Sequence, residues 1–438
     1  MCNFPPRRFS TRCVYWDGFE ENDMETITLT VPQACEETGI RRSLLEDLAL
    51  KILYLNGEMS LPELSEHMCL GLGVIEEIFQ FFRKQQLCEV RGMTRGAHRI
   101  AATSEGKLRA ADLLTLSQYA GPAPVSLSDY TARVHAQGVQ QAQVQPADVS
   151  RAFSSMVLDN DLISRIGTAV VSNTSIFLYG PPGAGKTTLA CYIPEIYNDK
   201  VWIPHAVEVD NQIITVFDAG THRRSNDVPA EEFDARWVLC DRPRVLAGGE
   251  LCAEMLDLQY SAGNRFYTAP LQMKANNGVL ILDDFGRQRM RPDELLNRWM
   301  TPLDRRIDFL SLPGGKKFEI PFDLFVVFST NLDPRELADE AFLRRIPNKI
   351  KVNHATPEEF RQILENYCRA RGVEWEAGAG EEAARFVREE MKRPLSQNLP
   401  RDLINQITWA ASYNGEAPKL TAEAIRQACR NYFLPVEN

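Results

Sequence analysis

The apolar positions near the start of the chain follow a helical period. From Arg41 they form one broad face that stops at Asn56-Gly57, and Ser60-Leu-Pro-Glu63 then has the form of a helix start with a serine cap. A third helical pattern runs from residue 73 to residue 87. Its inward-facing residues are expected to be Val74, Ile75, Ile78, Phe81 and Phe82. Two short strand-type stretches around a Gly/Arg-rich loop follow in residues 88–103, so we predict a winged-helix domain over residues 41–116.

A different pattern marks the middle of the chain. Short apolar runs of strand type occur at residues 175–179, where Ser175 precedes the apolar residues, and at 279–282 and 324–328, and each is followed by glycine or polar residues. Runs of this kind are typical of strands buried on both faces of a parallel sheet. We therefore predict an α/β fold whose parallel sheet carries helices on both faces.

Additional β-structure is expected between the first two of these strands. Residues 201–209 and 212–218 have strand character and meet at Asp210-Asn211, which predicts an inserted β-hairpin. Further along, Tyr260, Phe266 and Tyr267 flank a glycine-containing segment. These aromatic residues are interpreted either as part of a core cluster or as an exposed loop.

The first strand leads into a phosphate-binding motif. Residues 180–187 read Gly-Pro-Pro-Gly-Ala-Gly-Lys-Thr, which is G-x-x-x-x-G-K-[ST] in full. Glycines let the backbone N–H groups close around phosphates at a helix start, where Lys186 would reach the β and γ phosphates and Thr187 would bind Mg²⁺. The predicted ATP-binding residues are Gly180, Pro181, Pro182, Gly183, Ala184, Gly185, Lys186, Thr187 and Thr188.

Hydrolysis requires a second element, and the apolar run at 279–282 supplies it. That run ends in Asp283 and Asp284, about 100 residues after the phosphate loop. Asp283 is expected to hold Mg²⁺ through water, and Asp284 to polarise the attacking water. The third strand ends in Ser329-Thr330-Asn331, so Asn331 can orient the same water.

Three arginines follow in the sequence. Arg344 and Arg345 end an apolar helical stretch, and Arg401 stands at a helix start. Each one alone is more typical of a surface salt bridge. The order of the motifs changes that interpretation, because from about residue 150 to 438 the chain resembles the AAA+ ATPases. The motifs that carry the resemblance are, in order, the phosphate loop, the Asp-Asp strand end, the Ser-Thr-Asn strand end, the Ala-Phe-Leu-Arg-Arg segment and the C-terminal arginine helix.

The AAA+ resemblance implies roles that spacing does not establish. Arg345, or its neighbour Arg344, would project into the nucleotide of an adjacent subunit as an arginine finger, and Arg401 would contact the γ-phosphate from a helical lid. The glycine-containing aromatic segment would be an axial loop that grips substrate. The whole chain also resembles bacterial proteins labelled "ATPase with chaperone activity". One departure is Asp284, because AAA+ proteins usually have glutamate there, and the shorter side chain puts the hydrolysis rate in doubt.

These patterns together predict five regions. They are an N-terminal extension (1–40), the winged-helix domain (41–116), a linker (117–150), a nucleotide-binding domain with the hairpin insertion (151–355) and a helical lid (356–438).

Charge limits what the N-terminal domain can bind. Residues 41–115 contain equal numbers of basic and acidic side chains, and the whole chain carries a net charge of −10. The third helix opens with Glu76-Glu77, where an acidic turn would repel DNA phosphates. The wing is basic, with Arg91, Arg95, His98 and Arg99, and this keeps nucleic-acid binding as the weaker alternative. Protein docking is favoured, and a purely structural role remains open.

Other features of composition point to an intracellular enzyme. The ten cysteines are scattered without a C-x-x-C pair, and none of the six histidines is assigned to a metal. No secretory signal or membrane-spanning run is visible, so a cytoplasmic location is expected.

We therefore predict a Mg-ATP-dependent AAA+ ATPase that forms a homo-oligomeric, hexameric ring and remodels a protein partner. The alternatives are a DNA-acting AAA+ protein of helicase-loader or initiator type, and a slow nucleotide-gated adaptor.

Overall fold

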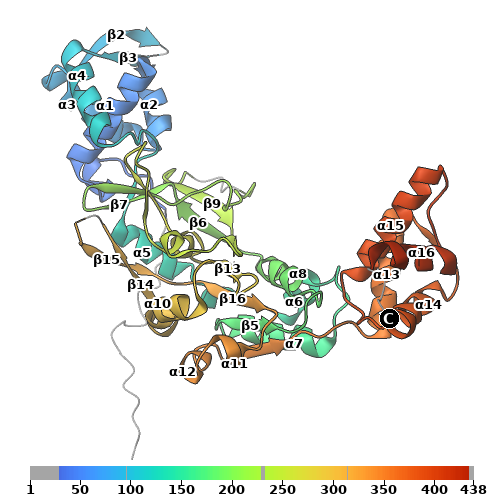
Figure 1. The fold of residues 1–438 in the computed structure, drawn as a ribbon. Helices are drawn as coiled ribbons and strands as arrows, with labels where there is room; N and C mark the ends of the chain where they lie inside the picture. The colour runs from blue at the N-terminus through green and yellow to red at the C-terminus, as the bar shows by residue number, and fades with distance from the viewer. Residues whose placement is uncertain (1–28, 95, 228–231, 313, 434–438) are drawn as a thin grey trace, which may run out of the picture.

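The structure is a computed structural model that describes residues 29–94, 96–227, 232–312 and 314–433. Figure 1 shows three parts along the chain. An N-terminal unit lies at one end, a sheet with flanking helices lies in the middle, and a group of C-terminal helices lies at the opposite side from the N-terminal unit.

The N-terminal unit combines helices with a small antiparallel sheet of order β1-β3-β2. Its elements are α1 (Arg42–Asn56), β1 (Glu58–Ser60), α2 (Leu61–Met68), α3 (Leu72–Lys84), β2 (Cys88–Thr94), β3 (Ala97–Ala102) and α4 (Ser104–Leu116), preceded by η1 (Cys35–Thr38). The predicted serine cap is present, because the Ser60 hydroxyl accepts from the N–H of Glu63 and the Glu63 carboxylate accepts from the N–H of Ser60. Phe81 is half-buried and packs against the core of this unit as predicted, whereas Phe79, which was not predicted to face inward, is fully buried. The winged-helix assignment itself stays a prediction.

The central sheet is parallel and has the order β10-β13-β16-β5-β17. Its strands are β5 (Ile176–Tyr179), β10 (Arg244–Ala247), β13 (Val279–Leu282), β16 (Phe325–Thr330) and β17 (Asn348–Lys351). Alternate residues of β13 enter different cores, with Val279 and Ile281 on one face and Leu280 and Leu282 on the other. The apolar runs therefore have their expected cause, which is burial on both faces.

Helices cover both faces of this sheet, which confirms the predicted α/β fold class. One face carries α6 (Pro146–Ala152), α7 (Asn160–Val171), α8 (Lys186–Tyr192) and η3 (Ile193–Ile196). The other face carries α10 (Pro292–Arg305) and α12 (Glu340–Leu343). Short connecting helices are η4 (Ala253–Leu256), α9 (Leu271–Lys274) and α11 (Pro334–Leu337).

The insertion predicted between the first two strands is larger than one hairpin. Its strands are β6 (Lys200–Pro204), β7 (Ala206–Val209), β8 (Gln212–Thr215), β9 (Trp237–Asp241), β11 (Gln259–Tyr260) and β12 (Tyr267–Thr268). The β7–β8 hairpin is confirmed, and its turn residues Asp210 and Asn211 have φ values of 53° and 64°. The single strand predicted over residues 201–209 is wrong, because β6 pairs with β9 whereas β7 pairs with β8 and β4 in another sheet. His205 separates β6 from β7, and its N–H donates to the carbonyl of Arg236.

A second hairpin, absent from the sequence analysis, precedes β16. It consists of β14 (Ile307–Ser311) and β15 (Lys317–Pro321), and its apolar residues join the core of the insertion. Alternating apolar residues on both sides of Gly314-Gly315 are the sequence signal that would have indicated it.

The C-terminal part is helical, as predicted for the lid. It contains α13 (Pro357–Arg371), β18 (Glu374–Trp375), α14 (Ala379–Arg385), η5 (Phe386–Glu390), α15 (Leu399–Asn414), β19 (Lys419–Leu420) and α16 (Ala422–Tyr432), and it has its own apolar core. In the described part of the chain, no helix has the length and apolar character needed to cross a membrane.

The N-terminal unit packs directly against the insertion. Ala206 and Ile213 of the β7–β8 hairpin belong to the apolar core of the N-terminal unit, and the rings of Tyr119 and Phe266 meet edge to face at 5.5 Å. Residues 117–150, predicted as a linker, contain β4 (Val125–Ser126), α5 (Leu127–Ala136) and η2 (Val139–Gln141) and lead into α6, and β4 pairs with β7.

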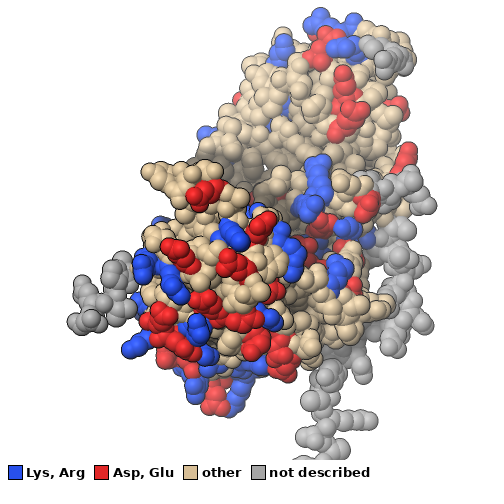
Figure 2. All heavy atoms as spheres, turned by 90° about the vertical axis from the view of Figure 1, so that its right-hand side faces the viewer, with Lys and Arg blue, Asp and Glu red and all other residues tan. Residues whose placement is uncertain are grey.

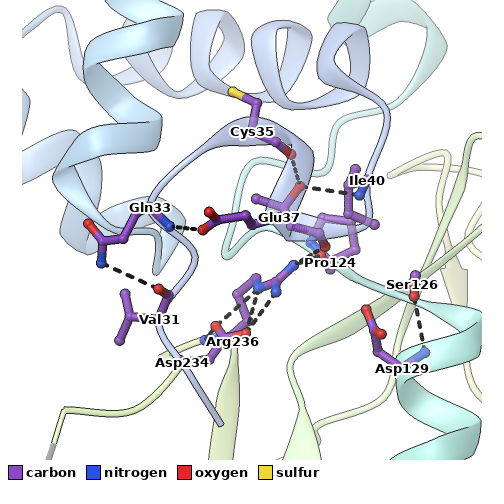
Figure 3. Close-up of polar contacts among 11 residues, drawn as sticks. Val31, Gln33, Cys35, Glu37, Ile40, Pro124, Ser126, Asp129, Asp234 and Arg236 are labelled. Carbon is purple, nitrogen blue, oxygen red and sulfur yellow. Dashed lines mark hydrogen bonds and ion pairs between the residues drawn. The ribbon is translucent and has the colours of Figure 1, made fainter.

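A buried guanidinium joins these segments (Figure 3). Arg236 and Asp234 form an ion pair with side chains only 4% and 5% exposed. Arg236 also donates to the carbonyl oxygens of Thr38 at 2.8 Å and Pro124 at 3.2 Å. One side chain of the insertion therefore holds both the segment before α1 and the segment before β4.

Replacing this arginine should weaken the junction strongly. Arg236→Met leaves the Asp234 carboxylate buried without its cation and leaves two carbonyl oxygens without their donor, so we expect a loss of about 3 to 5 kcal/mol in the free energy of unfolding. Denaturant titration followed by circular dichroism measures this loss. The control Arg335→Met removes an exposed pair with Asp333 and should change stability by about 1 kcal/mol or less. Equal effects of the two substitutions would contradict the role given to Arg236.

Candidate nucleotide site

The phosphate-loop motif connects β5 to α8. Gly180 and Gly185 have φ values of 144° and 80°, which disfavour any residue with a Cβ. A Cβ on Gly180 would lie 2.1 Å from the carbonyl oxygen of Val352, and one on Gly185 would lie 2.2 Å from Oε1 of Gln397. The loop therefore requires glycine at both positions for its backbone shape, and at Gly180 also for the close approach of the backbone at Val352.

Lys186 lies at the start of α8 with its ammonium group turned back into the loop. Its Nζ donates to the carbonyl oxygens of Gly180 at 3.0 Å and Pro181 at 2.8 Å and to Oδ1 of Asn331 at 2.7 Å. Lys186 is only 6% exposed, and burial lowers its pKa although the nearby carboxylates act in the opposite direction. The ammonium is thus held by neutral oxygens, and a phosphate oxygen can replace them as a stronger acceptor.

The two predicted carboxylates follow β13 and have different partners. The Thr187 hydroxyl donates to Oδ1 of Asp283 at 2.9 Å, and Nδ2 of Asn331 donates to Oδ1 of Asp284 at 3.1 Å. Asp284 is exposed and has a φ of 48°, a left-handed conformation that aspartate tolerates. Its turn is fixed by the next residue, because the Phe285 N–H donates to the carbonyl of Ser329.

Thr187 and Asp283 form a donor set that fits Mg²⁺. They present a hydroxyl and a carboxylate oxygen within hydrogen-bond distance of each other, beside the phosphate loop. Mg²⁺ prefers oxygen ligands and is usually held by one or two protein groups together with water and phosphate. Across the described residues, no cluster of three or more His, Cys, Asp or Glu side chains offers an alternative metal site.

A cavity of about 290 Å³ opens between the phosphate-loop side of the sheet and the C-terminal helices. Its walls come from three regions, namely the segment before α7, the start of α8 and the C-terminal helices. The lining residues are Ser155, Met156, Val157, Gly185, Thr188, Tyr192, Ile363, Asn366, Tyr367, Ala370, Gln397, Asn398 and Arg401. The mixture of aliphatic and tyrosine side chains with amide groups suits a nucleobase and ribose.

The segment before α15 contacts the phosphate loop directly. The Gln397 N–H donates to the carbonyl of Gly183 at 2.8 Å. Oδ1 of Asn398 is buried and has no hydrogen-bond partner among the described residues, which leaves an acceptor free at the cavity wall. Gln397 and Asn398 are not among the site residues predicted from the sequence. The sequence signal that could have indicated them is their position immediately before the helix that begins near Arg401.

The predicted arginines occupy different places. Arg401 lines the cavity and pairs with Asp402. Arg344 pairs with Glu340 one turn earlier in the chain and is largely exposed, whereas Arg345 pairs with Asp304 of α10. Neither Arg344 nor Arg345 has a hydrogen bond or ion pair with the site residues that the structure describes. Lys186, Thr187, Asp283, Asp284 and Asn331 are therefore brought together in one chain, and Arg344 and Arg345 are not.

Comparison with known proteins gives a partial match. Residues 356–431 match a family model described as "Domain of unknown function (DUF8689)". Comparison with curated proteins gives no match. Similar solved structures include NtrX from Brucella abortus in complex with ATP, with 15% identity, 76% of this chain and 65% of that chain covered, and a TM-score of 0.40. The ADP complex of NtrX has 15% identity, 60% and 52% coverage and a TM-score of 0.39, so this chain spans about half of its length. The Thermotoga maritima RuvB Holliday junction branch migration motor has 16% identity, 63% and 69% coverage and a TM-score of 0.35.

The position of Lys186 leads to a test of nucleotide binding. Lys186→Ala removes the cation that the loop holds for phosphate, so ATP affinity should fall by about 10- to 100-fold. Titration with a fluorescent ATP analogue measures the affinity. The control Lys351→Ala changes an exposed lysine on the adjacent strand β17 and should bind ATP as wild type does. Unchanged affinity in a folded Lys186→Ala protein would rule out the assigned phosphate site.

Proposed function

We propose that this chain is a Mg-ATP-dependent ATPase of the AAA+ type that works as an oligomeric ring to remodel a protein partner. The observation that carries the ATPase assignment is the position of Asn331. Its side-chain amide accepts from Lys186 and donates to Asp284, so one residue connects the phosphate-binding cation with the water-activating carboxylate. This arrangement supports cleavage of a phosphate bond rather than binding alone.

The chain's own groups divide the chemistry among them. Lys186 exchanges its carbonyl partners for phosphate oxygens and holds the terminal phosphates in the loop. Asp284 accepts a hydrogen bond from the attacking water, and Asn331 fixes the direction from which that water approaches. Mg²⁺ held at Thr187 and Asp283 would neutralise charge on the phosphate oxygens. Arg401 at the cavity wall can contact the nucleotide when the C-terminal helices close over it.

The ring is proposed from Arg344 and Arg345, neither of which has a hydrogen bond or ion pair with the described nucleotide-site residues of its own chain. Arg344 is 75% exposed at its side chain, and its only ion pair among the described residues is an exposed contact with Glu340 one helical turn away. A contact of this kind contributes little and is easily exchanged. An arginine so placed is available to a nucleotide in an adjacent subunit.

The charges of the N-terminal unit favour a protein partner over nucleic acid. Arg91 pairs with Glu89 and Arg99 pairs with Glu58, so each of these cations of the predicted wing has a carboxylate beside it. On the face seen in Figure 2, where the C-terminal helices lie toward the viewer, basic and acidic side chains are also interspersed. Binding to a polyanion requires cations that are free to replace counterions, and these pairs reduce their number.

The role of Asp284 can be tested separately from nucleotide binding. Asp284→Asn should retain ATP affinity but lower the hydrolysis rate by about 100-fold or more, because only water activation is removed. Phosphate release measures the rate. Asp293→Asn, at the start of α10, is the control and should hydrolyse ATP normally. Asp284→Glu should hydrolyse faster than wild type if the short side chain limits the rate. Wild-type turnover by Asp284→Asn would assign water activation to another group.

The arginine finger can be tested by mixing inactive proteins. Arg345→Ala or Arg344→Ala should bind ATP but hydrolyse it about 10³-fold more slowly if that arginine acts across a subunit boundary. A mixture with Lys186→Ala should then regain activity, because the Lys186→Ala subunit supplies an arginine to a neighbouring intact nucleotide site. Arg335→Ala, at another exposed arginine, is the control and should be fully active. A mixture that stays inactive while light scattering shows mixed oligomers would contradict the ring mechanism.

A further inference from the structure

A second buried lysine, far from the nucleotide site in sequence, lacks an acidic partner. Lys51 of α1 is only 5% exposed, and its Nζ donates to the carbonyl oxygen of Ser117 at 3.2 Å. Among the described residues, no carboxylate lies within ion-pair distance of it. Asp47, one turn earlier on α1, is engaged by Arg109 at 3.2 Å. Buried lysines are almost always paired, because an uncompensated charge in the interior is costly.

Lys51 lies in the wall of a pocket of about 490 Å³ between the N-terminal unit and the β7–β8 turn. The apolar part of the wall comes from both sides. It consists of Leu44, Leu48, Leu113, Leu116 and Ile213. Leu116 is 74% exposed, whereas Leu48 and Ile213 are buried, so the aliphatic surface that faces solvent beside the buried ammonium is chiefly that of Leu116. A ligand that covers this surface and brings one negative charge to Lys51 would satisfy both features.

Two further cations stand at the pocket. Arg41 precedes α1 and Arg265 precedes β12, both are exposed, and neither has an ion pair with a described residue. In the described lining Asp47 is the only acidic residue; its carboxylate pairs with Arg109 and also acts on Lys51, whose pKa it raises against the larger effect of burial. The pocket is therefore locally positive in a chain whose net charge is −10. This charge favours an acidic ligand.

The walls distinguish between acidic ligands. The described lining contains no aromatic side chain on which a base could stack, and stacking provides much of the affinity for single-stranded nucleic acid. Leucine and isoleucine side chains instead match the aliphatic side chains of a protein segment. We propose that this pocket binds an acidic, leucine-containing segment of a partner protein, with one of its carboxylates paired to Lys51.

The pocket gives such a segment contact with two parts of the protein. Lys51 and Leu116 belong to the N-terminal unit, whereas Ile213 and Arg265 belong to the insertion between β5 and β13, the strands that lead to Lys186 and Asp283. The inference deepens the proposed protein-remodelling function and rests on the protein-docking part of it. It does not require the ring.

Binding to peptides tests the proposal in the full chain. Labelled peptides composed of Leu and Glu should bind more tightly than counterparts with Gln in place of Glu. Lys51→Met should weaken binding of the acidic peptide by about tenfold or more, because a charge-assisted hydrogen bond is lost. The control Lys107→Met removes an exposed lysine of α4 and should bind as wild type does. Methionine is apolar and fits a buried site, so Lys51→Met is expected to fold at least as stably as wild type.

The dependence on pH provides a second readout. Burial lowers the pKa of Lys51 to about 8, so the ammonium is charged below that pH and neutral above it. Affinity for the acidic peptide should therefore fall about tenfold between about pH 7 and pH 9 in wild type, and this change should disappear in Lys51→Met. The other charged groups of the described pocket lining are Arg41, Asp47 and Arg265, and Arg109 of α4 pairs with Asp47.

The outcomes separate this inference from the ATPase assignment. Basal ATP hydrolysis by Lys51→Met should equal that of wild type, because Lys51 contacts no nucleotide-site residue. Equal binding of Glu and Gln peptides, binding of neither, or unchanged binding by Lys51→Met would each overturn the proposed pocket. Lys51-dependent binding of single-stranded DNA in place of the peptide would overturn it as well. None of these results would change the expectations for Lys186 and Asp284.

Discussion

The order of strands in the parallel sheet is the constraint on which the candidate nucleotide site depends. Strand β16 lies between β5 and β13, so the residue that follows it, Asn331, stands between the residues that follow its two neighbours. Because the strands are parallel, their carboxyl ends meet at one edge of the sheet. A chain in which β5 and β13 were adjacent would bring Lys186 and Asp284 together without the intervening amide. The strand order therefore determines both the spacing and the mutual orientation of these groups.

Contacts from both ends of the chain reach this central sheet and its insertion. The C-terminal helices meet the phosphate loop through Gln397, whose N–H bonds to Gly183, and the N-terminal unit is held to the insertion by Arg236. A movement of the phosphate loop would therefore act directly on the C-terminal helices. The N-terminal unit is connected to the insertion through buried polar bonds and shared apolar packing. Buried charge-assisted bonds break only at high cost, so we expect the N-terminal unit and the insertion to move together.

Candidate-site residues could be predicted from the sequence where the signal lies in their neighbouring residues, and not where it depends on distant contacts. Lys186 and Thr187 belong to one continuous motif, and Asp283, Asp284 and Asn331 each follow an apolar strand, so neighbouring residues were enough to locate them. Gln397 depends on a contact across more than 200 residues, which a single sequence does not reveal. Residues 201–209 form two strands where one was predicted, because the chain passes from one sheet to another at His205. This is a tertiary effect that local strand propensity does not reveal. The buried position of Arg236 was hidden for a related reason, since arginine is ordinarily a surface residue.

Lys186 and Lys51 are both buried lysines whose ammonium groups are held by neutral oxygens. Lys186 and Lys51 are both almost fully buried, and burial lowers the pKa of each. Three neutral oxygens hold the Lys186 ammonium, whereas one carbonyl holds that of Lys51 in the described structure. Neutral acceptors compensate a desolvated charge less well than an anion does, so each site gains more from an incoming anion than an exposed lysine would. At Lys186 the backbone loop shapes the site for phosphate. At Lys51 aliphatic side chains surround the ammonium instead of a phosphate loop, and in our proposal they favour an acidic segment that also carries apolar side chains.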